Sequence, residues 1–282
     1  MHPDANPHAN PRTDASADLP GPMRTLARAT LLEARRSGLP LLALACIAGA
    51  IGLAAFVSQV AITESVPLQA SLVAALLRAS AAFLVAAHVV TSVVRESADK
   101  GFELALSLPV SRSQFYLGRL LGHAAAGTAI ATAFALPLLA WATPGAVAAW
   151  WLSLAFETLL VASLSLFLVF TLAHVVPALA AAAGFYVLAR GIASVQAISS
   201  SPLADESIGS RAAQWAVDGV ALLLPRLDIA TRSDWLVYGA PGAAELGRVL
   251  ASLAVYAARA SAAGLVDFHR RNLGPRRATN AP

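Results

Sequence analysis

Three ionisable side chains, Arg78, Glu157 and Arg190, stand inside long apolar stretches of the sequence. If these stretches cross a bilayer, a charge near its centre costs at least ~2.5–3.5 kcal/mol and needs a partner or a route to the surface. Two interpretations are open. In one, Glu157 pairs with Arg190 or Arg78 as a candidate ion pair and lines a substrate path. In the other, both arginines extend to the outer headgroups and Glu157 only joins two helices. The second is favoured, because one intramembrane carboxylate does not show what passes it.

Residue patterns that carry enzyme chemistry are missing from the sequence. It contains no GxxxxGK[ST] stretch, no HExxH and no paired acidic cluster within an apolar stretch. Its single cysteine, Cys46, provides neither a disulfide nor a thiolate metal site. His88 and His123 are expected to act as interfacial hydrogen-bonding groups. We therefore expect no catalytic residues, no metal site and no cofactor bound by this chain.

The distribution of apolar residues predicts a membrane protein. Of the 282 residues 57% are hydrophobic and 13% are charged, whereas soluble domains carry about 25% charged residues. The stretch 39–58 holds 20 residues without a charge, which as a helix spans roughly 30 Å, the thickness of the hydrocarbon core. Backbone groups in lipid must bond within their own segment, so such stretches are helical. We predict an all-α polytopic fold over 38–268, with six spans at 39–58, 71–94, 120–141, 147–170, 174–198 and 243–266.

The segments around these spans have distinct compositions. Residues 1–22 are predicted to be a disordered tail, 23–37 an amphipathic interfacial helix, and 269–282 a basic cytosolic tail. The longest connection, 199–243, is predicted to hold a helix that begins behind Ser210 and ends at Pro225, lying flat on the membrane or dipping into it. Two pairs of small residues, Gly118 with Gly122 and Ala45 with Gly49, permit close helix packing.

Basic residues predict the orientation of the chain. With a cytoplasmic N-terminus, thirteen Arg and Lys residues fall in inner segments and three (Arg211, Arg226 and Arg232) in the outer loop. This bias predicts a multi-pass protein of the inner membrane with both termini in the cytoplasm. It also accounts for the net charge of +4 through membrane lipids, without a nucleic acid partner.

The stretch 95–119, between the second and third spans, is predicted to form a cytosolic helical hairpin. Pro109 ends its first helix, and Ser111 followed by Gln114 forms a capping-box pattern that starts a new helix leading into the third span. Apolar side chains such as Leu106 alternate with charges such as Glu96 and Glu103. A short helix of this kind is suited to a groove on a cytosolic partner.

This stretch resembles the segment between spans two and three in the permease subunits of type-2 ABC exporters. The residues that carry the resemblance are Glu96, Gly101, Glu103, Leu106, Pro109, Val110, Ser111, Arg112, Leu117, Gly118 and Arg119. Six spans, a preceding amphipathic helix and a long outer region before the last span agree with that family. One departure is the pair Asp99-Lys100, where the family often has more acidic residues; this leaves open which ATPase subfamily would match.

The resemblance implies a mechanism. Two permease subunits, identical or related, would work with two ATP-binding subunits that bind ATP and magnesium. The segment from Glu96 to Arg112 would be the coupling helix seated on the ATPase, and closure of the ATPase pair would move the spans and push a substrate outward. A self-sufficient secondary transporter or channel is the alternative; it would usually show internal repeats, and the sequence has no convincing one. The resemblance does not identify the substrate.

Overall fold

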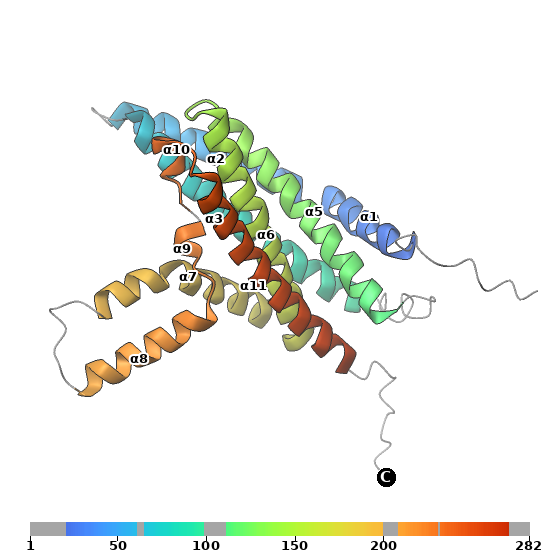
Figure 1. Cartoon of the computed structure of the whole chain (residues 1–282). Coiled ribbons are helices and arrows are strands. Elements are labelled where there is room, and N and C mark those ends of the chain that lie inside the picture. Colours follow the sequence, from blue (N-terminus) through green and yellow to red (C-terminus); the bar gives the residue numbers. More distant parts are fainter. Residues whose placement is uncertain (1–20, 61–64, 99–110, 200–207, 231, 271–282) are drawn as a thin grey trace, which may run out of the picture.

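The computed structural model describes residues 21–60, 65–98, 111–199, 208–230 and 232–270 (Figure 1). Throughout these residues the regular structure is helical, and six of the helices are long and apolar enough to cross a membrane. The chain is an all-α polytopic membrane protein, as predicted. Its helices are α1 (Gly21–Arg36), α2 (Leu39–Val60), α3 (Ser65–Ala98), α5 (Arg112–Leu138), α6 (Pro144–Leu172), α7 (Val175–Ser199), α8 (Ile208–Leu223), α9 (Leu227–Ala230), α10 (Trp235–Tyr238) and α11 (Ala243–Arg270).

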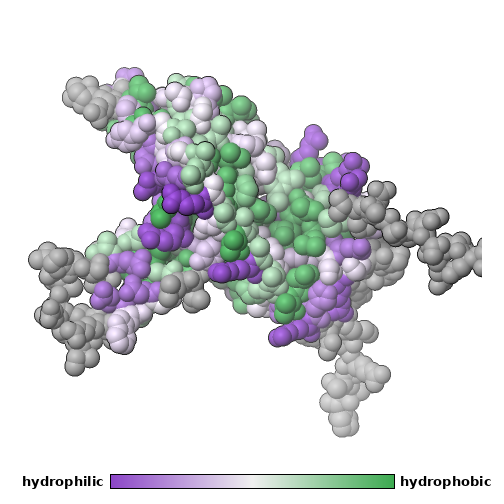
Figure 2. All heavy atoms as spheres, viewed as in Figure 1, coloured by the Kyte–Doolittle hydropathy of each residue, from purple (hydrophilic) through white to green (hydrophobic). Residues whose placement is uncertain are grey.

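Helix α6 is the centre of the bundle, since α3, α5, α7 and α11 all pack against it, and α2 packs on the outer side of α3. Its buried face carries the small hydroxyl residues Ser153, Thr158, Ser163 and Ser165, all fully buried. Small residues let helix backbones approach closely in lipid, where no hydrophobic force drives helices together. Apolar residues cover much of the surface of the bundle in Figure 2.

Two helix starts differ from the predicted positions for local reasons. Helix α5 begins at Arg112, eight residues before the predicted span, because the capped helix continues without a break into the apolar stretch. Pro144, which lies between the predicted spans 120–141 and 147–170, is the first residue of α6. A proline at this position loses no helical hydrogen bond, since its missing N–H would have had no partner there.

Helix α1 packs lengthwise on α5. Leu26 meets Gly118 and Thr30 meets Gly122, so both residue numbers increase along the contact and the two helices run in the same direction. Figure 1 shows α1 beside the first half of α5. Only Ser37 and Gly38 separate α1 from α2. We call the end of the bundle where α3 ends and α5 begins the hairpin end.

The predicted helix in the connection before the last span is confirmed as α8, although Ser210 is its third residue and not its cap. Helix α8 folds back along α7, and this pair extends to one side of the bundle (Figure 1). The side chain of Trp215 is 79% exposed, whereas Val217 and Ala221 of the same helix pack against buried residues of the bundle. Hydrophilic residues gather in a hollow beside α9 and the start of α11 (Figure 2), where Arg226, Glu245 and Arg248 line a cavity.

Candidate functional site

A buried ion pair joins the middle of the bundle. Arg78 on α3 places Nη1 2.5 Å from Oε2 of Glu157 on α6, and both side chains are fully buried. The second terminal nitrogen of Arg78 donates to Oγ of Ser153 at 2.9 Å, and the guanidinium lies 4.9 Å from the ring centroid of Trp150. Both terminal nitrogens of Arg78 are thus paired where water is excluded, which is how intramembrane charges are tolerated. Its Nε has no hydrogen-bond partner among the described residues.

The same carboxylate continues the polar contacts to a third helix. The hydroxyl of Tyr186 on α7 donates to Oε1 of Glu157 at 2.7 Å, and Arg190 Nη1 donates to the Tyr186 hydroxyl at 3.3 Å. We call Arg78, Glu157, Tyr186 and Arg190 the central polar chain. It links α3, α6 and α7, and its formal charge is +1 because it contains two arginines and one carboxylate.

The central polar chain differs from the favoured interpretation of the sequence in one respect. Arg78 does not extend to a surface, because α3 packs against α6 and turns this side chain toward Glu157. Arg190 is close to Glu157 only through Tyr186. The sequence interpretation missed Tyr186 and Ser153, each of which lies four residues from a charged member of the chain and so on the same helix face.

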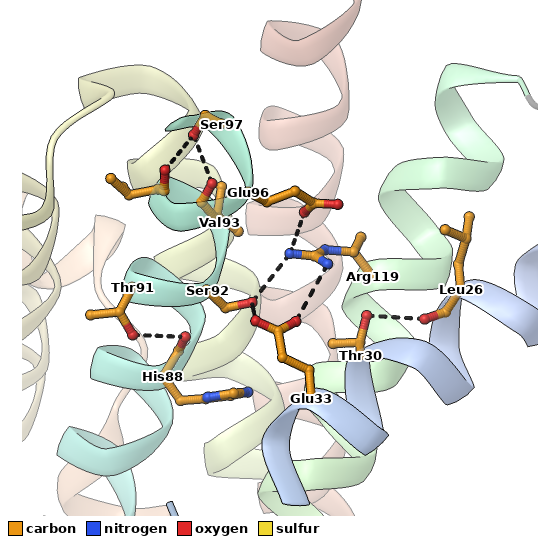
Figure 3. Close-up of polar contacts among 11 residues, drawn as sticks. Leu26, Thr30, Glu33, His88, Thr91, Ser92, Val93, Glu96, Ser97 and Arg119 are labelled. Atoms are coloured by element: carbon orange, nitrogen blue, oxygen red, sulfur yellow. Dashed lines mark hydrogen bonds and ion pairs between the residues drawn. The ribbon is translucent and has the colours of Figure 1, made fainter. Parts of the chain in front are cut away.

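A second polar cluster lies at the hairpin end, around Arg119 of α5. Its Nη2 is 2.6 Å from Glu96 Oε2 on α3 and donates to Ser92 Oγ at 3.2 Å. Its Nη1 is 3.7 Å from Glu33 Oε2 on α1, and Ser92 in turn donates to the other oxygen of Glu33 at 2.8 Å. Figure 3 shows these side chains converging from three helices. We call Glu33, Ser92, Glu96 and Arg119 the hairpin-end cluster; its formal charge is −1.

Two glycines on either side of Arg119 bring α1 against α5. A Cβ added at Gly118 would lie 2.9 Å from Leu26 Cβ, and one added at Gly122 would overlap Thr30. The small-residue pair predicted from the sequence therefore packs α1 and α5 at close range. The other predicted pair does not: a Cβ on Gly49 meets no atom within 4 Å, and this face of α2 is exposed.

The first turn of α5 is fixed from two sides. Ser111 caps it: the hydroxyl accepts from the backbone N–H of Gln114, and the Gln114 side chain accepts from the backbone N–H of Ser111. This confirms the predicted capping box. Arg112 donates from Nη1 to the carbonyl of His269 at 3.0 Å, near the end of α11, where a cation also complements the helix dipole.

Aromatic packing holds the same end of the bundle together. Phe115 stacks on Phe268 with ring centroids 5.9 Å apart, and Phe170 lies 4.9 Å from Phe268 and 5.9 Å from Tyr116. All four side chains are buried, so α5, α6 and α11 meet in an apolar contact beside the polar cluster.

The residues predicted to form the ATPase-coupling segment are therefore placed in part. Glu96, Ser111 and Arg112 are all engaged in contacts within the chain. Gly101, Glu103, Leu106 and Pro109 lie outside the described residues. Glu96 was expected to face a partner protein, whereas it is held by Arg119; the sequence could not show that the two ends of the stretch 95–119 lie side by side.

His88 and His123 lie next to the hairpin-end cluster. Their rings meet edge to face with centroids 5.4 Å apart, and both are buried, His123 almost completely. They contact each other inside the bundle. Nε2 of His88 and both ring nitrogens of His123 have no hydrogen-bond partner among the described residues, so the hydrogen bonding expected from the sequence is not seen there. Within the described ranges, no three His, Cys, Asp or Glu side chains gather closely enough to hold a metal ion.

Comparison of the chain with protein-family models found no match, and comparison with curated protein sequences found none either.

Proposed function

We propose that this chain is the transmembrane permease subunit of an ATP-binding-cassette exporter of the inner membrane. A separate ATPase subunit hydrolyses ATP, and a second permease subunit, identical or related, completes the transport path. Both termini and the hairpin end face the cytoplasm. The resemblance over 95–119 supports the family, and six membrane-spanning helices agree with it.

The observation that carries the proposal is the anchoring of both flanks of the stretch 99–110. On one side Glu96 is held by Arg119; on the other, α5 begins at a capped Ser111 and is tied to α11 through Arg112. Because its flanks are fixed, a displacement of this stretch would be transmitted to α3 and α5, the two helices that it connects. This is the property that a segment seated on an ATPase needs.

The first experiment is recovery of the tagged chain from its host in gentle detergent, with mass spectrometry of the proteins that co-elute. A stoichiometric partner that contains a nucleotide-binding P-loop is expected. Elution of the folded chain alone would overturn the proposal.

A charge-reversal variant tests docking of the stretch itself. Glu103→Lys should abolish recovery of the ATPase subunit while membrane insertion stays normal. Glu96 is unsuitable for this purpose, because its reversal would also break the ion pair with Arg119. Glu245→Lys, at the opposite end of the bundle, is the matched control and should leave recovery unchanged. Equal recovery of the ATPase with Glu103→Lys would contradict the coupling assignment.

Cysteine labelling tests the orientation separately. In a chain whose native Cys46 is replaced by alanine, Ser97→Cys lies exposed at the hairpin end and should react only from the cytoplasm. Tyr238→Cys, 88% exposed beside the start of α3, should react only from outside. The opposite labelling would reverse the orientation.

A self-sufficient transporter or channel is the second candidate. The central polar chain favours it, because a buried carboxylate bonded to an arginine and a tyrosine is a feature that ion and proton paths also use. Transport by the purified chain in vesicles without nucleotide would support this class, whereas strict dependence on ATP and a second protein would exclude it.

A further inference from the structure

Within the described residues, Arg119 of α5 is the residue whose side chain makes polar contacts with both α1 and α3. Its side chain is 7% exposed, and its two terminal nitrogens reach a carboxylate on α3, a hydroxyl on α3 and a carboxylate on α1. A planar guanidinium can serve several acceptors at fixed angles, which a lysine ammonium cannot reproduce. Arg119 therefore sets the relative position of three helices at once.

The contact between α1 and α5 is close as well as polar. Gly118 and Gly122, one residue before and three after Arg119, bring the α5 backbone against Leu26 and Thr30 of α1. Packing without intervening side chains leaves little room for sliding. Helix α1 is thus attached to α5 by a packed seam, with the Glu33 contact to Arg119 and Ser92 at one point along it.

Helix α1 continues into α2 through only two residues outside the helices, Ser37 and Gly38. Helix α2 packs on α3 and lies on the outside of the bundle. A movement of α1 is consequently delivered to the start of α2, because the joint is short and hydrogen-bonded on both sides: the Ser37 amide donates to the Glu33 carbonyl, and the Leu39 amide donates to Ser37 Oγ.

From these contacts we propose that Arg119 is a positioning residue that makes α1 move together with the first turns of α5, so that displacement of the stretch between α3 and α5 reaches α2. The proposal rests on the proposed function for the source of the displacement, which is the ATPase subunit. The linkage through Glu33, Ser92 and Glu96 belongs to this chain alone and can be tested without that partner.

The test measures distances between spin labels in the complex with its ATPase subunit, with and without a non-hydrolysable ATP analogue. The chain carries Cys46→Ala and one of two label pairs. The first pair, Ala29→Cys with Leu172→Cys, reports α1 against α6. The second, Leu117→Cys with Leu172→Cys, reports α5 against α6. All three labelled positions are exposed.

In the parent chain both label pairs should change distance when the analogue binds. With Arg119→Met the α5 pair should still change in full, whereas the α1 pair should change by less than in the parent chain, because the glycine contacts remain but the polar link to Glu33 is lost. The ATPase should still co-purify. Arg95→Met is the matched control: it removes an exposed arginine at the same end of the bundle, with no ion pair among the described residues, and should leave both changes intact.

An α1 change in Arg119→Met as large as in the parent chain would overturn the proposal, as would its absence in the parent chain while the α5 pair changes. A merely structural role predicts that both changes or the complex are lost, not that the α1 change alone is reduced.

Failure of the proposed function is separable from failure of the linkage. If no ATPase subunit is recovered, the proposed function falls, and the chain alone is labelled at Ala29 and Leu117. Arg119→Met should then broaden the α1–α5 distance distribution, with Arg95→Met unchanged. An unchanged distribution in Arg119→Met would overturn the linkage itself.

Discussion

The central polar chain and the hairpin-end cluster both pair arginine with glutamate, yet they differ in burial and therefore in the cost of breaking their contacts. In the first, Arg78 and Glu157 are both fully buried and paired one to one. In the second, Arg119 is buried but its partners Glu96 and Glu33 are 24% and 32% exposed. A fully buried pair is costly to break, because a charge left without its partner stays away from water. The ion pairs of the partly exposed cluster contribute less to stability, because water and salt screen them.

The two regions join different sets of helices. The central polar chain holds α3, α6 and α7 at a fixed spacing. The hairpin-end cluster joins α1 and α3 to the first turns of α5. Both regions hold helices together, and the buried pair is the stronger of the two.

The largest expected effect comes from removing one member of the buried pair. Glu157→Ala should lower the free energy of unfolding by about 3–5 kcal/mol, because Arg78 keeps its charge in an apolar site. The double variant Arg78→Met with Glu157→Leu should be much less destabilised, since neither charge remains. Reversible unfolding in mixed micelles measures both. If the free energy of unfolding of Glu157→Ala were no lower than that of the double variant, an unpaired buried charge would not be the cause of the loss.

The next effect tests the packed seam. Gly122→Ala should destabilise the chain by about 1–3 kcal/mol, because the new Cβ overlaps Thr30 on α1. Gly49→Ala is the matched control: its Cβ meets open space, and alanine is the better helix former by about 1 kcal/mol, so stability should hold or rise slightly. The same assay reports both. Equal stability of the two variants would show that α1 is not seated as described.

A smaller effect is expected at the start of α5. Ser111→Ala removes the side-chain acceptor for the Gln114 amide and should cost about 1 kcal/mol. The loss should be local: amide exchange should quicken in the first turn of α5 and stay unchanged near Glu157. Faster exchange at both regions would mean that the hairpin end and the centre of the bundle are not independent.

The smallest effect separates the two regions by their response to salt. Glu96→Gln should cost about 1 kcal/mol or less, because the pair with Arg119 is partly exposed. The difference from the parent chain should shrink further in about 1 M salt, where the Debye length is about 3 Å. The loss in Glu157→Ala should not change with salt. If the stability loss in Glu96→Gln were also independent of salt, the two groups of polar residues would not differ in their screening by solvent.

Several features were within reach of the sequence because they depend on neighbouring residues. Six helices follow from long runs of apolar residues, since a backbone in lipid must satisfy its hydrogen bonds within its own segment. The capping box at Ser111 follows from the spacing to Gln114. Boundaries were less accurate, as at Pro144 and Ser210, because a helix can begin at several residues of similar propensity.

Side-chain partners were beyond the sequence. That Glu157 meets Arg78 directly, and Arg190 only through Tyr186, depends on how α3, α6 and α7 are rotated against one another. That Gly118 and Gly122 form a close contact while Gly49 does not depends on which helix faces them. The glycine spacing is the same in a packed seam and on an open face.

The sequence by itself determined that this protein is a helical membrane protein with a capped helix after the stretch 99–110, because hydropathy and capping are local properties. Only the tertiary structure decided that Glu96 is held by Arg119 and that α1 runs along α5. The physical reason is that helix rotation and direction follow from the packing of all the helices together, and no single stretch of sequence carries that information.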